Sequence, residues 1–317
     1  MSFQILGTGS YVPPRAVTND ELSEFLDTSD EWITRRIGVK QRYICTTEST
    51  ADLAVEAAAR AMENAGVEPQ ELDMILCATI SGDDATPALA CMVQKRLGAS
   101  CPAMDINSAC SAFIFMLDTA AGFFARKKVK KMLVVGAERM SRLLDWSDRS
   151  TCVIFGDGAG AAVLGEGEGY LASRLLTKGG DDVIRCPQTN GASPFCQRPQ
   201  PHPFVFMNGQ ETYKFAVQSI CKDLKDVIGE AGFTPQQIDH VVLHQANLRI
   251  IQAAKKRLNI PEEKYWTNIQ KYGNTSSASI PIVLDEMNRQ GRLKRGQILA
   301  MCAFGGGLSS GACILQW

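Results

Sequence analysis

Three residues of types that can take part in covalent chemistry are the strongest functional candidates in this chain: Cys110, His244 and Asn274. Cys110 follows a strand-like segment (102–106) and precedes a helical one (111–126), which predicts a position at or near a helix N-terminus. There the free amides and the helix dipole favour the thiolate over the thiol, and the amides can hold an oxyanion. Most cysteines in apolar segments are only small buried hydrophobes, so position makes Cys110 a candidate nucleophile.

His244 and Asn274 each have a functional and a structural interpretation. His244 ends the apolar run 241–243, so it is either a hydrogen-bonded structural histidine or an acquired functional group. Asn274 opens a Ser- and Thr-rich segment that leads into a helix. Asparagine is a preferred helix N-cap, and its amide can also donate to a reacting carbonyl. The glycines at 305–307 follow a buried strand and would let the backbone approach a ligand closely.

The chain contains an internal repeat, which indicates two similar half-domains. Two such halves usually pack about a pseudo-twofold axis, and Cys110 and Asn274 would then meet because they lie on corresponding segments. We expect an N-terminal half (1–168) with the cysteine and a C-terminal half (169–317) with the histidine and asparagine. The matching segments are 65–73 with 231–239, 107–118 with 274–285, and 156–164 with 307–315.

Strand-length apolar runs alternate with helical patterns, which predicts α/β sheets with helices on their faces. Helices are expected over 51–65, ended by Gly66, and over 212–231, ended by Gly232. The Pro-rich segment 181–209 breaks the pattern, and we expect a long ordered loop that covers a substrate tunnel. The predicted buried strands are 74–79, 132–136, 241–243 and 298–302.

Composition excludes several classes of protein. The 317 residues are 45% hydrophobic and 21% charged, and the net charge of −1 gives no basic footprint for nucleic acid. No apolar run approaches the roughly 20 residues that span a bilayer, and the N-terminus lacks a secretory signal, so we expect neither membrane insertion nor export. The 11 scattered cysteines are typical of a reducing cytoplasm. No zinc-ligand spacing occurs, so no metal is predicted.

The segments 108–111, 244–247, 272–279 and 305–307 together resemble the thiolase superfamily, most closely the β-ketoacyl-[acyl carrier protein] synthase III family. The resemblance runs from Ile5 to the C-terminus, and the His and Asn motifs are specific in combination. It implies a duplicated thiolase-like five-layer α/β/α/β/α sandwich with two pseudo-twofold-related halves, usually as a homodimer.

The resemblance also implies an acyltransferase reaction. The family condenses an acyl-CoA primer with malonyl-[acyl carrier protein] by a decarboxylative Claisen reaction that initiates fatty acid synthesis. Cys110 would form the acyl-enzyme, and His244 and Asn274 would stabilise the enolate as hydrogen-bond donors. The backbone amides of Cys110 and Gly306 would form the oxyanion hole. Coenzyme A thioester is a substrate here, and no cofactor is expected.

Binding residues follow from the same resemblance. Trp32 and Arg149 would sandwich the adenine. Phe304 would shape the acyl pocket, and Thr86 would enter that pocket from the partner subunit, leaving room for primers larger than acetyl. The coenzyme A site would comprise Thr28, Trp32, Arg36, Arg149, Gly209 and Asn247. The carrier-protein docking residues would be Lys214, Arg249 and Lys256, which are otherwise ordinary charges on solvated helix faces.

Alternatives lie inside and outside this family. A secondary-metabolite acyltransferase or ketosynthase of the same close family, with another acceptor, is the nearest alternative. A hydroxymethylglutaryl-CoA synthase would need a glutamate near residues 77–79, and a thiolase would need a second cysteine beside 305–307. Outside the family, the chain could be a non-catalytic scaffold or a cysteine hydrolase in which His244 activates Cys110.

Overall fold

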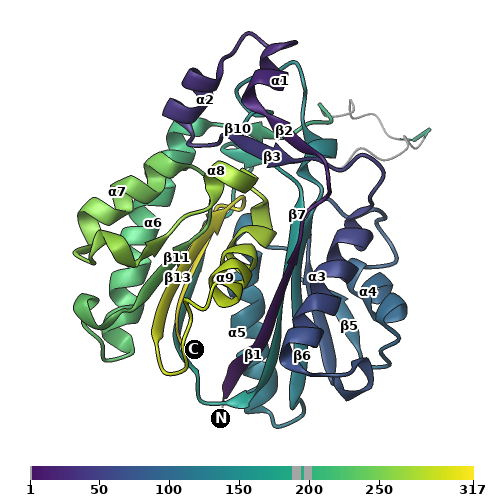
Figure 1. Cartoon of the computed structure of the whole chain (residues 1–317), viewed down its shortest axis with the longest axis vertical. Coiled ribbons are helices and arrows are strands. Elements are labelled where there is room, and N and C mark those ends of the chain that lie inside the picture. Colours follow the sequence, from purple (N-terminus) through teal and green to yellow (C-terminus); the bar gives the residue numbers. More distant parts are fainter. Residues whose placement is uncertain (1, 188–193, 196–201) are drawn as a thin grey trace.

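The computed structural model describes residues 2–187, 194–195 and 202–317, and five layers follow one another across the molecule (Figure 1). Two five-stranded sheets alternate with three layers of helices. The first sheet has the order β1-β7-β6-β4-β5 and the second has β8-β14-β13-β11-β12. In both, the last three strands are parallel and the first two pairings are antiparallel. The thiolase-like sandwich and its internal duplication are therefore confirmed.

The predicted strands are found where the apolar runs lie. The first sheet contains β1 (Ser2–Tyr11), β4 (Met74–Ala78), β5 (Ala103–Asp105), β6 (Lys131–Glu138) and β7 (Gly158–Gly167). The second contains β8 (Tyr170–Thr177), β11 (His240–Leu243), β12 (Tyr265–Trp266), β13 (Ile298–Gly305) and β14 (Ser309–Gln316). We propose the boundary 168/169 between the halves, in the link from β7 to β8.

Helices fill the three other layers. The outer pairs are α3 (Thr50–Ala65) with α4 (Leu89–Leu97), and α6 (Gly209–Glu230) with α7 (Leu248–Leu258). The central pair is α5 (Ala112–Ala125) with α9 (Ser279–Arg289), which lies between the sheets (Figure 1). Gly66 ends α3 in the left-handed conformation and Gly232 follows α6 in the same conformation, as predicted.

The central helices are buried because they face a sheet on either side. Phe113, Ile114, Met116 and Leu117 of α5 are fully buried in a cluster that also includes residues from both sheets and α9. A helix that is apolar on most of its circumference is typical of such an interior position. This layer fixes where α5 and α9 begin, and both helices begin beside the candidate site.

Smaller elements form a cap at one end of the sandwich, at the top of Figure 1. The cap comprises α1 (Asn19–Ser23), α2 (Asp30–Arg36), α8 (Ile269–Tyr272), and the strand pairs β2 (Ala16–Thr18) with β3 (Gln41–Tyr43) and β9 (Ile184–Arg185) with β10 (Phe206–Met207). The ends of the segment predicted to cover a tunnel form β9 and β10. Residues 188–193 and 196–201 of that segment lie outside the described residues.

We expect glycine to be required where β7 passes the central layer. A Cβ on Gly160 would lie 2.7 Å from the backbone nitrogen of Ile282 in α9. Gly160→Ala should lower the free energy of unfolding by about 1–3 kcal/mol, because neither backbone can move freely. Gly122→Ala is the control, since a Cβ there meets open space; it should stabilise α5 by about 0.5–1 kcal/mol. Urea unfolding midpoints measure both, and equal shifts would contradict the packing argument.

Candidate active site

Two equivalent turns carry the predicted cysteine and asparagine segments. Asn107 Oδ1 accepts a hydrogen bond from the amide of Ala109 at 3.2 Å, and Asn274 Oδ1 accepts one from Ser276 at 2.8 Å. Ala109 and Ser276 hold φ values of +46° and +51°. Such left-handed conformations cost about 1–3 kcal/mol in residues other than glycine. Both halves thus retain the same strained turn, each followed by a 3-10 helix that leads into a central helix.

The two turns meet, as the repeat predicted. The 3-10 helices η2 (Ala109–Ser111) and η6 (Ser276–Ala278) pack on each other, and the Ser276 hydroxyl is close enough to the Cys110 thiol to lower its pKa. A Cβ on Gly305 would lie 2.8 Å from the Cys110 amide nitrogen. The first glycine of the 305–307 run therefore lets β13 approach the cysteine itself.

The predicted preference for thiolate is wrong for the unliganded protein. Cys110 keeps some exposed surface, yet burial raises the pKa of its thiol to about 11. The carboxylate of Glu138 adds to this rise, while the Ser276 hydroxyl and the cysteine's own amide oppose it. Cys110 lies in η2, before α5 begins, and desolvation outweighs the favourable amides. The thiol is therefore protonated at neutral pH.

His244 follows β11, as expected, and is 1% exposed. Its Nδ1 lies 2.6 Å from Ser279 Oγ, which also accepts a hydrogen bond from the Gln245 amide. When the serine hydroxyl donates to Nδ1, the neutral ring carries its proton on Nε2. Burial lowers the pKa of His244 to about 3, so the ring is neutral at physiological pH. Phe304, 2% exposed, packs edge-on against it at 5.2 Å between ring centroids.

Both backbone groups of Asn274, its amide and its carbonyl, form hydrogen bonds. Its amide donates to the Ile154 carbonyl at 2.9 Å and its carbonyl accepts from Gly156 at 3.1 Å. Its side-chain oxygen is used by Ser276, which leaves the Nδ2 protons as the donors that the side chain can offer. Asn274 is not the N-cap of α9, a position taken by Ala278. The structural interpretation as a helix cap is therefore wrong.

Sequence reasoning missed Glu138, a fully buried carboxylate at the end of β6. It accepts hydrogen bonds from the backbone amide of Ile80 and from side-chain hydroxyls of both halves. Burial raises its pKa, although the Ile80 amide and the hydroxyls of Ser81, Ser276 and Ser277 oppose the rise. An acidic residue at the end of an apolar strand was the signal that could have found it, because the same reasoning selected His244. The hydroxyl donors are Thr79, Ser81, Ser276 and Ser277.

The predicted adenine sandwich is not open in the structure. The guanidinium groups of Arg36 and Arg149 each lie 5.3 Å from the centroid of the Trp32 ring, and Arg149 also forms an ion pair with Asp27. Stacked layers need about 3.5 Å each, so an adenine between Trp32 and Arg149 requires the arginine to move. A cleft of about 760 Å³ next to them is lined by Trp32, Arg36, Arg249 and three neighbouring residues.

The other predicted coenzyme A residues differ in exposure and in whether they already form hydrogen bonds within the protein. Thr28 has a buried hydroxyl without a hydrogen-bond partner among the described residues. Gly209 is the exposed first residue of α6. Asn247 is already engaged: it caps α7 by accepting from the Arg249 amide, and its Nδ2 donates to the Arg36 carbonyl. Asn247 therefore ties α2 to α7, whether or not it also binds a ligand.

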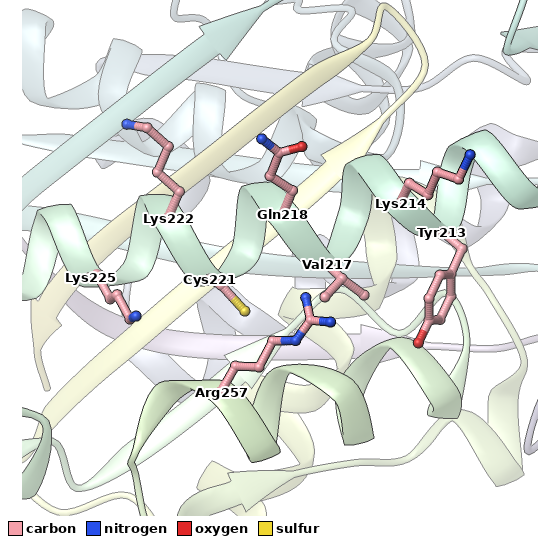
Figure 2. A pocket seen from close by; sticks show the side chains of 8 residues that line it. All are labelled: Tyr213, Lys214, Val217, Gln218, Cys221, Lys222, Lys225 and Arg257. Carbon is pink, nitrogen blue, oxygen red and sulfur yellow. The ribbon is translucent and has the colours of Figure 1, made fainter.

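Thr86 is exposed on the loop after β4, and the described structure shows no contact between it and Cys110. The predicted docking residues are spread over three hollows. Lys214, paired with Glu211, lines a groove of about 560 Å³ between α6 and α7 (Figure 2). Arg249 lines the cleft beside Trp32, and Lys256 lies in a smaller hollow at the end of α7.

Known proteins match this chain over its full length. Models of 3-oxoacyl-[acyl-carrier-protein] synthase III match residues 104–179, and models of its C-terminal region match residues 228–317. The chain is 46% identical to the β-ketoacyl-[acyl-carrier-protein] synthase III of Clostridium acetobutylicum, over 100% of this chain and 99% of the relative. The chain belongs to the β-ketoacyl-[acyl-carrier-protein] synthase III family. It is therefore a condensing enzyme and an acyltransferase, of the kind that initiates fatty acid synthesis.

Solved structures of synthase III proteins agree with this assignment. The crystal structure from Aquifex aeolicus has a TM-score of 0.93 and 43% identity, and the match covers 99% of this chain and 100% of that one. The priming β-ketosynthase of the R1128 polyketide pathway has the same TM-score but 33% identity, with coverage of 99% and 96%. The secondary-metabolite alternative therefore has less support than fatty acid synthesis.

The protonation of His244 can be tested by nitrogen NMR, because the chain has only three histidines. We expect the His244 ring to stay neutral from pH 8 down to pH 5, since its pKa is lowered to about 3. The unfolded chain binds this proton near the ordinary value of about 6.5, so below that pH His244 reduces stability by about 1.4 kcal/mol per pH unit. His244→Gln removes this contribution. A His244 resonance that titrates near pH 6.5 would contradict the assignment.

Proposed function

We propose that this synthase condenses an acyl-CoA primer with malonyl-[acyl carrier protein] through an acyl-Cys110 intermediate. The products are 3-oxoacyl-[acyl carrier protein], coenzyme A and carbon dioxide. The observation that carries the proposal is the meeting of the two equivalent turns, which joins Cys110 of one half to the Asn274 segment of the other. His244 lies in the same region. Its ring packs against Phe304, and the next residue of β13, Gly305, lies beside Cys110.

The first half-reaction is an acyl transfer to the cysteine. Cys110 Sγ attacks the thioester carbonyl, the carbon–sulfur bond to coenzyme A breaks, and coenzyme A leaves. The backbone amides of Cys110 and Gly306 are the proposed donors to the developing oxyanion. A Cβ at Gly306 would meet only side-chain atoms, Ile184 Cγ2 at 3.4 Å and Ala109 Cβ at 3.7 Å. The loop at Gly306 therefore faces the cysteine turn, which supports this role.

The second half-reaction needs donors that stay uncharged. His244 Nε2–H and Asn274 Nδ2–H would donate to the malonyl thioester carbonyl, so that loss of carbon dioxide leaves a stabilised enolate. The enolate carbon then attacks the acyl-Cys110 carbonyl and releases the Cys110 thiolate. The neutral ring of His244 supports this assignment, because with Nδ1 accepting from Ser279 it offers Nε2–H as a donor. Both half-reactions use backbone and side-chain groups of the protein, and no cofactor or metal is proposed.

The remaining assignments are proposals of the same kind. Trp32, Arg36, Arg149 and Thr28 would hold coenzyme A, with Gly209 and Asn247 beside it, and Lys214, Arg249 and Lys256 would face an acidic carrier protein. Charges at the rim of an interface mainly change the rate at which the carrier protein associates with the enzyme. We propose a cytoplasmic homodimer in which Thr86 of one subunit borders the acyl pocket of the other. None of the described helices is long and apolar enough to cross a membrane.

The acyl-enzyme can be tested by mass spectrometry of the intact protein after incubation with acetyl-, butyryl- and isobutyryl-CoA. We expect one acyl adduct per chain and none in Cys110→Ala. His244→Ala and Asn274→Ala should still form the adduct but lose condensation by about 10²–10³-fold, since each removes one donor to the enolate. Absence of any adduct would sink the proposed function. Steady hydrolysis of acyl-CoA without malonyl-carrier would instead favour a hydrolase.

The role of Thr86 can be tested with Thr86→Phe. If Thr86 borders the partner's acyl pocket, the larger ring should cut kcat/KM for isobutyryl-CoA by about 10-fold or more while acetyl-CoA stays within about 3-fold, because only the longer chain meets the ring. Thr86→Val, similar in size to threonine, is the control. A parental enzyme that greatly prefers acetyl-CoA, or a phenylalanine variant with an unchanged preference, would show that Thr86 does not limit the pocket.

A further inference from the structure

Glu138 is a fully buried carboxylate that the reaction scheme above does not use. One oxygen, Oε2, accepts from Ser81 Oγ at 2.6 Å and from the Ile80 amide at 3.0 Å, both in the segment after β4. The other oxygen, Oε1, accepts from Ser277 Oγ at 2.8 Å and Ser276 Oγ at 3.1 Å. Its two oxygens therefore face different halves of the chain, and Oε1 faces the turn that meets Cys110.

Ser276 connects this carboxylate to the cysteine. Its hydroxyl donates to Glu138 Oε1, and it lies in η6, which packs on the η2 helix that carries Cys110, close enough to lower the pKa of the thiol. A hydroxyl has one proton to donate, so while Ser276 donates to Glu138 it can only accept from the thiol. The resting order is Cys110 S–H, then Ser276 O–H, then the Glu138 carboxylate. Ser276 is fully buried, and no other hydrogen bond of its hydroxyl is found among the described residues.

Electrostatics favour the transfer of a proton from the Cys110 thiol through Ser276 to Glu138. Loss of the thiol proton to solvent would leave two anions, thiolate and carboxylate, together in a site that excludes water, which is costly. Transfer of the proton to Glu138 leaves one negative charge, now on sulfur. The Ser276 hydroxyl then donates to the thiolate instead of the carboxylate. Burial also raises the pKa of Glu138, which makes its carboxylate a stronger base than an exposed one.

We propose that Ser276 and Glu138 remove the Cys110 thiol proton during acyl transfer. The inference rests on the proposed function, because it concerns the first half-reaction of that scheme. As Sγ bonds to the thioester carbon, the S–H proton moves to Ser276 Oγ and the serine proton moves to Glu138 Oε1. The carbon–sulfur bond of the acyl-CoA then breaks, and coenzyme A departs as a thiolate. Glu138 later returns its proton through Ser276 to the Cys110 thiolate released by condensation.

His244 is a poorer acceptor for this proton. In the tautomer that donates to the malonyl carbonyl, Nε2 carries the ring proton and Nδ1 faces the Ser279 hydroxyl, so the ring offers the thiol no free lone pair. Burial lowers its pKa to about 3, which disfavours imidazolium. The structure therefore separates two tasks. His244 and Asn274 donate hydrogen bonds to the malonyl group, whereas Ser276 touches the thiol and Glu138 acts through Ser276 as a positioning and proton-holding residue.

The test measures single-turnover formation of the acyl-Cys110 adduct by rapid quench and intact-protein mass spectrometry between pH 5.5 and 9. In the parental enzyme the rate should fall as the pH drops through the raised pKa of Glu138. In Glu138→Gln it should be lower by about 10²-fold at pH 7 and rise about tenfold per pH unit, because only solvent-formed thiolate then reacts. Ser276→Ala should behave like Glu138→Gln, and Glu138→Asp should recover most of the loss.

Two controls separate a proton path from structural support. Ser81→Ala removes an equally buried hydrogen bond to the other oxygen of Glu138, and its acylation rate should fall by less than about 10-fold without a change in the pH profile. Decarboxylation of malonyl-carrier needs Asn274 but not the thiol proton. In a Cys110→Ala background, adding Glu138→Gln should therefore change decarboxylation by no more than about 3-fold.

The outcomes distinguish this inference from the function on which it rests. A parental enzyme that forms no adduct overturns both. An adduct that forms equally fast in Glu138→Gln, or an unchanged pH profile, overturns the proton path alone. Equal losses in acylation and decarboxylation would show that Glu138 only supports the turn that carries Asn274, which also overturns it. If Glu138→Gln fails to fold, Ser276→Ala carries the same comparison.

Discussion

Close contact between backbones at the centre of the molecule is the constraint on which the rest of the site depends. A Cβ at Gly136 would lie 2.6 Å from the Ser277 carbonyl oxygen, and one at Gly305 would lie 2.8 Å from the Cys110 amide nitrogen. Both glycines belong to strands, β6 and β13, that occupy the same position in their respective sheets. Each half therefore provides a glycine against which the turn of the other half packs. Any larger residue would push the two turns apart.

This packing places strained turns where chemistry is needed. Ala109 and Ser276 occupy equivalent positions in the repeat, and both hold left-handed backbone conformations beside the cysteine and the asparagine. The duplication supplied two identical turns, and the two then diverged in side chain. Cys110 corresponds to Ser277, so one turn offers a thiol where the other offers a hydroxyl to Glu138. The N-terminal half therefore supplies the nucleophilic thiol, and the C-terminal half supplies a hydroxyl that binds Glu138.

The electrostatic character of the site follows from the exclusion of water. Burial keeps His244 neutral and Cys110 protonated, and the hydrogen-bonded carboxylate of Glu138 raises the pKa of the Cys110 thiol further. A neutral donor suits the stabilisation of an enolate, but a protonated thiol is a poor nucleophile. The site therefore needs a proton acceptor that adds no further charge, a need that the hydroxyl–carboxylate pair Ser276 and Glu138 can meet.

The sequence by itself determined the fold class, the duplication, the main strands and helices, and the family. It could do so because local periodicity, turn glycines and repeated segments do not depend on distant contacts. It also selected Cys110, His244 and Asn274. Only the tertiary structure decided their protonation, because desolvation depends on what packs around a group, and the predicted thiolate was wrong for that reason. Glu138 was missed and the direct contact of Arg149 with Trp32 was not foreseen, since both depend on contacts between residues far apart in the sequence.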